Sequence, residues 1–194
     1  MDKITFDCKL TQKPDALVVE YTITNERDVD FGVFNRITGT AIDGARDYSP
    51  NNVYREIQGA VLLLEKIALP IPQGLRMAAY VPPHASRLSA GKALTETFTV
   101  PVPVLVRQPY LRAKAAGVGG EVIPSRPVTL SEAEVVIGIF PLAETGLVAE
   151  HPAFPDVLTP QPPHPAVAGQ IKLGARFKLD APIEVLDYEV FPWP

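Results

Sequence analysis

Hydrophobic residues recur at every second position along much of this chain, which is the spacing of strands rather than of helices. Between Ile4 and Leu10 every even position is apolar, and the positions between them carry Thr, Asp or Lys. The same period runs through residues 17–24 and again through 29–33. Val, Ile, Tyr, Phe and Thr supply most of these positions, and they fit the pleated, half-buried surface of a sheet. The pattern therefore predicts antiparallel strands.

The polar cluster Asn25–Asp28 separates two of these apolar stretches. Asn tolerates the left-handed backbone conformation, and the Asp side chain accepts hydrogen bonds within its own turn. We therefore predict a hairpin across residues 17–34 with this cluster as its turn. The alternative is that the cluster is a recognition loop.

The remaining pattern predicts an all-β fold in a single domain, residues 1–194. The 21 prolines work against long helices, and the best helical stretch, Arg112–Ala116, meets Gly117 at once. Further strands are expected at residues 60–68, 75–81, 93–100, 134–140, 171–179 and 183–190. The residues expected in the core are Tyr21, Ile23, Phe31, Val33, Phe98, Ile137, Ile139 and Phe177.

Two segments carry a family resemblance. "LVVEYTITNERDVDFGVF", an apolar strand entering an Asn-containing turn, and the later "LSAGKALTETFTVPVPV" resemble bacterial immunoglobulin-like sandwich domains. The resemblance implies an antiparallel immunoglobulin-like β-sandwich with long Pro-rich loops, and it implies a fold only. The Cys–Trp–Cys core of antibody domains is absent, because Cys8 is the single cysteine and Trp193 lies at the C-terminus.

Charge and composition limit the classes of partner that the protein is expected to bind. The formal charge is 18 − 22 = −4 with both signs interspersed, so no basic block favours nucleic acid. No apolar run is long enough for membrane insertion, and no Lys/Arg-rich amphipathic segment is present. Residues 1–20 contain no signal-peptide core, so the chain as written is expected to be cytoplasmic. If an export signal has been removed, the protein is periplasmic or secreted.

Proline-rich segments predict an edge strand and a long exposed loop. The segment "FTVPVPVLVRQPYL" places prolines and valines on opposite faces, which predicts an edge strand or a polyproline II segment. The connections at residues 38–52 and 151–165 are long, and long loops in compact domains are often functional. The prolines of residues 151–165 predict an exposed loop without ladder pairing.

No catalytic or metal-binding motif stands out. His151, Asp156 and His164 share one loop, but their spacing matches no metal motif, so we expect no metal and no cofactor. The segment His84–Ser86 lacks the Gly-x-Ser-x-Gly elbow of a serine hydrolase. Alternation places Cys8 in the core, which argues against a reactive thiolate. Glu132 and Glu134 share a strand face as a glycosidase pair would, but aromatic residues are only 8%.

These observations favour a non-enzymatic β-sandwich that binds another protein. The alternatives are a carbohydrate- or small-molecule-binding sandwich, with or without hydrolytic activity, and a structural subunit of an assembly. Loops and edge strands on a rigid scaffold are the usual places for binding, and aromatic residues and arginines are enriched at interfaces. The candidate interaction surface consists of His151, Phe154, Val157, Leu158 and His164, with Arg107, Tyr110 and Arg112 at the end of the Pro-rich segment.

Overall fold

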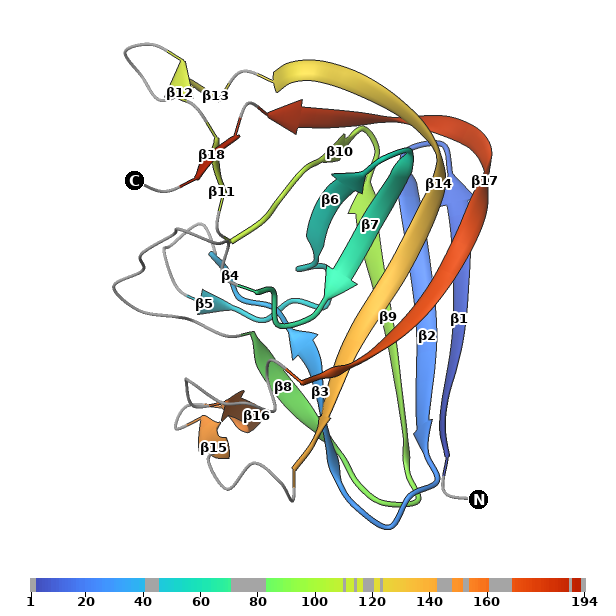
Figure 1. The fold of residues 1–194 in the computed structure, drawn as a ribbon, viewed down its shortest axis with the longest axis vertical. Helices are drawn as coiled ribbons and strands as arrows, with labels where there is room; N and C mark the ends of the chain where they lie inside the picture. The colour runs from blue at the N-terminus through green and yellow to red at the C-terminus, as the bar shows by residue number, and fades with distance from the viewer. Residues whose placement is uncertain are drawn as a thin grey trace.

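The strands of this chain form two main sheets, one of three strands and one of nine, which face each other (Figure 1). The described residues contain no helix, so the predicted all-β class is confirmed. No helix among them is long and apolar enough to span a membrane. The computed structural model describes residues 3–40, 46–70, 83–109, 111–113, 115–116, 121–122, 124–142, 148–151, 154–160, 169–188 and 190–192.

The three-stranded sheet is a regular antiparallel array. β1 (Ile4–Lys13) and β2 (Ala16–Asn25) pair along their whole length, and β9 (Ala93–Pro101) pairs with the other edge of β2. Their side chains alternate between the core and solvent, as the period of two predicts. The strands predicted from the alternation at residues 4–10 and 17–24, and the strand predicted at residues 93–100, are confirmed.

The nine-stranded sheet is organised around two long antiparallel strands, β14 (Pro124–Pro141) and β17 (Ile171–Tyr188). Their register shifts between Leu130 and Glu132, opposite residues 179–182 of β17. The sequence predicts two strands in β17, and the shift falls in the gap between them. Both strands bend at one end of the molecule, so that the sheet curls toward β1 and β2 (Figure 1).

The other strands of the nine-stranded sheet pair on either side of these two. β7 runs parallel to β14, whereas β3 pairs with the end of β14 in the antiparallel sense. These strands are β3 (Phe31–Arg36), β6 (Tyr54–Gln58), β7 (Val61–Lys66), β8 (His84–Leu88), β10 (Val104–Leu105), β15 (Val148–His151) and β16 (Phe154–Pro160).

Three small ladders lie outside the two main sheets. The best helical stretch of the sequence, residues 112–116, contributes to strands instead, because strand pairing overrides the weak helical preference of an alanine-rich stretch. The predicted strand at residues 75–81 lies outside the described residues. The ladders are β4 (Gly39–Thr40) with β5 (Arg46–Asp47), β11 (Leu111–Ala113) with β18 (Val190–Pro192), and β12 (Ala115–Ala116) with β13 (Glu121–Val122).

The predicted hairpin at residues 17–34 is wrong. β2 belongs to the three-stranded sheet and β3 to the nine-stranded one, so the connection crosses between sheets. The turn chemistry itself is present, because Asn25 Oδ1 accepts from Arg27 N at 3.0 Å and Asn25 Nδ2 donates to Val29 O at 2.8 Å. Alternation fixes which face of a strand is buried, but a hairpin turn and a crossover arch use the same polar residues.

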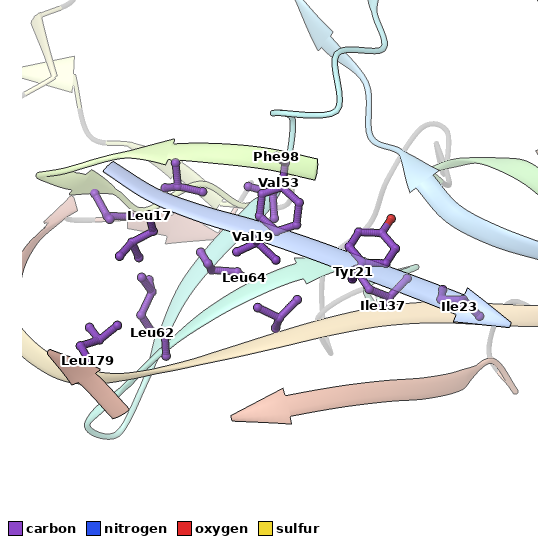
Figure 2. Packing of buried hydrophobic residues seen from close by; sticks show 14 of the residues in the cluster. Leu17, Val19, Tyr21, Ile23, Val53, Leu62, Leu64, Phe98, Ile137 and Leu179 are labelled. Atoms are coloured by element: carbon purple, nitrogen blue, oxygen red, sulfur yellow. The ribbon is translucent and has the colours of Figure 1, made fainter. Parts of the chain in front are cut away.

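The main core lies between the two sheets, where side chains of β2 meet those of β7 and β14 (Figure 2). Of the residues predicted for the core, Phe177 is only partly buried, because it lies on the more exposed half of β17. The others, at most 1% exposed, are Tyr21, Ile23, Phe31, Val33, Phe98, Ile137 and Ile139.

A second apolar cluster covers part of the opposite face of the nine-stranded sheet. Phe34 and Phe140 point away from the main core, since their neighbours in sequence point into it, and their rings lie 4.7 Å apart. Leu158 of β16 completes this cluster together with Ala68 and Ala85. We call this opposite face the outer face; β16 covers one end of it.

Two glutamine side chains complete the backbone pairing where strands diverge. Gln12 of β1 donates from Nε2 to Ala181 O at 2.9 Å and accepts from Ala181 N at 3.1 Å, at the register shift of β17. Gln170 bonds Ala68 in the same way, at 2.6 Å to the carbonyl oxygen and 3.0 Å from the amide nitrogen. Each amide therefore replaces a missing strand neighbour and satisfies two backbone groups.

The Pro-rich segment lies at sheet edges, as predicted. β9 ends at Pro101 as an edge strand, the chain crosses at the cis peptide bond between Val102 and Pro103, and β10 pairs at the edge of the other sheet. Asn51 protects the β9 edge, because its Oδ1 accepts from Thr99 N at 2.8 Å.

Candidate functional site

The predicted loop at residues 151–165 is not exposed over its whole length. Val157 is 5% exposed and Leu158 is 3% exposed, because β16 packs onto β8 and β15. The prediction of exposed apolar anchors is therefore wrong for these two residues. The prolines do not prevent pairing here, since Pro160 lies opposite Val148 at the end of the ladder.

The other predicted interaction residues divide into two groups. Arg107 is part of the fold, because its guanidinium donates to Asn52 Oδ1 and to Thr38 O, both at 3.2 Å. It is therefore engaged with its own chain. For the remaining predicted residues the structure describes at most the backbone: His151 in β15, Phe154 in β16 and Arg112 in β11, while Tyr110 and His164 lie outside the described residues.

A buried polar network links the two sheets inside the main core. The carboxylate of Glu96 on β9 accepts from Tyr21 Oη at 3.0 Å and from Asn35 Nδ2 at 3.0 Å, and it forms an ion pair with Lys66. Lys66 is 0% exposed and also donates from Nζ to Pro50 O at 2.7 Å. Every charged atom of the network thus has a partner, which is what a buried ion pair requires.

The charged groups of this network are enclosed by the fold. Burial lowers the pKa of Lys66 and the Glu96 carboxylate opposes that shift, while burial and then Glu96 raise the pKa of Tyr21. Lys66 Nζ also lies 4.8 Å from the centre of the Phe98 ring, on the core side of β9. A catalytic acid or base must reach its substrate, and Lys66 has no exposed surface with which to do so.

An acidic groove lies on the outer face, on the part of the nine-stranded sheet where β6, β7, β14 and β17 lie side by side. It holds about 440 Å³, and Leu69 and Pro70 are among its lining residues. Glycine at position 174 leaves β17 without a side chain there, which helps to open the hollow. The outward residues form two rows across the strands: Glu56, Leu63, Glu134 and Arg176 in one, and Tyr54, Glu65, Val136 and Gly174 in the next.

The electrostatics of the groove are unbalanced. Glu65 is 6% exposed, and among the described residues its carboxylate has no hydrogen bond and no ion pair. Burial raises its pKa, the nearby carboxylates of Glu56 and Glu134 raise it further, and Lys172 lowers it. Burial also raises the pKa of Glu56. Lys172 is the only basic residue among the described residues that line the groove.

The sequence analysis missed the groove because its parts come from four strands. It places Glu132 and Glu134 on one solvated face, but in the structure they differ. Glu132 accepts from Arg176 Nε at 2.9 Å, whereas Glu134 lines the groove. The parallel pairing of β7 with β14 brings Glu65 beside this face, and no local pattern predicts such a long-range pair. The available signal was an acidic residue directly after the apolar run Val61–Leu64.

The described residues offer no convergent metal or nucleophile site. No three His, Cys, Asp or Glu side chains in this part of the chain are placed to hold one ion. His84 Nδ1 shares a hydrogen bond with Thr159 Oγ1 at 3.0 Å, whereas Ser86 Oγ accepts from Arg36 at 3.1 Å. Burial raises the pKa of Cys8 to about 11, which removes its thiolate at neutral pH.

Comparison of the chain with protein-family models, with curated proteins and with solved structures gave no match in any of the three.

Proposed function

We propose that this protein is a non-enzymatic β-sandwich that binds another protein, with the acidic groove at the centre of its contact surface. The observation that carries the proposal is the Glu65 side chain, which is 6% exposed, lines the groove, and has neither a hydrogen bond nor an ion pair in the described part of the chain. A buried charge without a hydrogen bond destabilises the folded chain. A ligand that supplies the missing donor removes this cost, so the site is better suited to a bound state than to an empty one.

The surroundings of the groove suit a protein partner. Next to the groove the outer face carries the exposed, charged side chain of Arg176 on β17. A recessed centre with a polar rim is the usual anatomy of a protein interface. Non-enzymatic action is supported by the enclosure of Lys66 and by the protonated Cys8 thiol. We also propose that the fold is an immunoglobulin-like sandwich whose second sheet is enlarged and curled.

A second candidate function is small-molecule binding. The groove volume of about 440 Å³ falls within the range of about 300–1,000 Å³ that small-molecule sites occupy. A thermal-shift screen of amines, sugars and nucleotides tests this alternative. A compound at about a hundred times its dissociation constant adds about 2.7 kcal/mol to the unfolding free energy.

A pair of leucine substitutions on β17 tests the proposed protein-binding function. A Cβ at position 174 would lie 3.5 Å from Glu134 Oε1, an ordinary contact, so Gly174→Leu introduces a side chain into the groove. Lys178→Leu adds the same side chain to the same outward face of β17, outside the lining of the groove. The probe is a displayed library of short random peptides, selected on the unaltered protein.

We expect selected peptides to lose binding to Gly174→Leu and to keep it with Lys178→Leu. Peptides that bind both variants equally, or a library that yields no specific binder, overturn the proposal. Circular dichroism and thermal unfolding of both variants confirm that they remain folded.

A further inference from the structure

The lining of the acidic groove is partly apolar and partly acidic. Its walls include the apolar side chains of Leu63, Ile67 and Val136, and its acidic groups come from three neighbouring strands. An occupant must therefore place apolar atoms against the walls and donors against the carboxylates. Long basic side chains have this construction, since an aliphatic stem carries a charged head.

The net negative charge of the groove lining favours a positively charged occupant. The lining carries Glu56, Glu65 and Glu134 against one described basic residue, Lys172. Lys172 forms no ion pair with Glu65, so the most deeply buried carboxylate of the groove still lacks a donor among the described residues. A carboxylate accepts only, and a charge-assisted hydrogen bond from a cation is stronger than one from a neutral donor. A metal ion is a poorer fit, because no three ligating side chains in the described part converge.

We infer that the groove receives a lysine or arginine side chain of the partner protein, with its cationic head at Glu65 and its stem along Leu63, Ile67 and Val136. This inference rests on the proposed protein-binding function and names the chemistry of the contact. The occupant is a basic residue in a protein segment, not a free organic amine.

The probes are short alanine peptides, acetylated and amidated, whose central residue is lysine, arginine or norleucine. Norleucine keeps the lysine stem and removes the charge. Binding is measured by nuclear magnetic resonance from chemical-shift changes of the backbone amides in the groove strands. The lysine and arginine peptides are expected to shift the amide resonances of Val136 and Gly174. We expect the norleucine peptide to bind about tenfold more weakly or worse, as loss of a charged hydrogen bond implies.

Matched neutral variants identify the carboxylate. Glu65→Gln keeps the shape of the side chain and removes its charge, and it is expected to lower the affinity for the lysine peptide about tenfold. Glu20→Gln removes the same charge from an exposed position on β2, in the three-stranded sheet, and is expected to leave the affinity unchanged. Should Glu65→Gln fail to fold, Glu134→Gln in the same groove gives the same comparison.

The outcomes separate this inference from the proposed function. Selected library peptides that need an open groove but carry no basic residue, or that tolerate Glu65→Gln, overturn the inference and leave the proposed function standing. Equal affinity for free butylamine and for the lysine peptide also overturns it, in favour of a small organic cation. Peptides that bind Gly174→Leu and Glu65→Gln as tightly as the unaltered protein overturn the inference and the proposed function together.

Discussion

Removing the Glu96 carboxylate should destabilise the protein more than removing an exposed charged side chain. The perturbation is Glu96→Leu, which leaves the ammonium group of Lys66 enclosed at 0% exposure with only Pro50 O as its acceptor. Tyr21 Oη and Asn35 Nδ2 lose their acceptor at the same time. Breaking a buried pair from one side costs about 3–5 kcal/mol.

This magnitude translates into a large thermal effect. For a chain of this length each kcal/mol lowers the unfolding midpoint by about 2–4 °C, so we expect a fall of about 6–20 °C. The second variant, Lys66→Met, should cost less, because Glu96 keeps two donors and its side chain is 11% exposed. The double variant should recover part of the loss, because it removes both charges from the core.

The assay is urea unfolding followed by circular dichroism for the parent, the two single variants and the double variant. Glu132→Gln serves as the exposed control, since its ion pair with Arg176 is solvated and should contribute at most about 1 kcal/mol. A loss below about 1 kcal/mol for Glu96→Leu would refute the reasoning. So would full additivity of Glu96→Leu and Lys66→Met, because it would mean that the two charges do not interact.

Three further predictions follow from single positions. Gly138→Ala should cost about 1–3 kcal/mol, because its Cβ would lie 2.2 Å from the Gln170 oxygen that holds Ala68, whereas Gly174→Ala should be neutral in the same melts. Cys8 should react with Ellman's reagent at neutral pH about a hundredfold more slowly than an exposed thiol, since partial burial raises its pKa to about 11; a normal rate contradicts this effect. Because burial raises the pKa of Glu65 above 4.5, the folded state holds a proton that the unfolded chain releases. Its contribution to stability therefore falls as pH rises above about 4.5. Glu65→Gln should flatten that part of the stability–pH curve, and an unchanged curve counts against the burial of this carboxylate.

Alternation predicted strands well because it is a local property. Residues 4–10, 17–24 and 93–100 each carry enough information to specify both a strand and its inward face, and β1, β2 and β9 follow it. Pairing partners are not local. The same polar residues at Asn25–Asp28 serve a hairpin or an arch, and the choice depends on which sheet buries Phe31.

Prolines misled the prediction for a physical reason. Pro160 lacks an amide donor, but it sits at the end of the β15–β16 ladder, where one fewer hydrogen bond is tolerated. Burial of Leu158 in the second apolar cluster is favourable and stabilises this pairing, and Val157 is also buried. The count of prolines in residues 151–165 carries no information about this packing, since Ala85 and Phe140 lie far away in sequence.

The last two residues of β7 show how structure and binding are separated in this fold. Glu65 and Lys66 are adjacent, both are nearly inaccessible, and the strand turns them to opposite faces. Lys66 points into the core and has Glu96 and Pro50 O as partners. Glu65 points into the acidic groove, and within the described structure its carboxylate has none. Burial alone therefore does not distinguish a structural charge from a binding one, but the presence of hydrogen-bond and ion-pair partners does. A satisfied buried charge fixes how the two sheets pack, whereas an unsatisfied one lowers stability until a donor arrives from outside. By that criterion the structural role belongs to Lys66, and the binding role we propose belongs to Glu65.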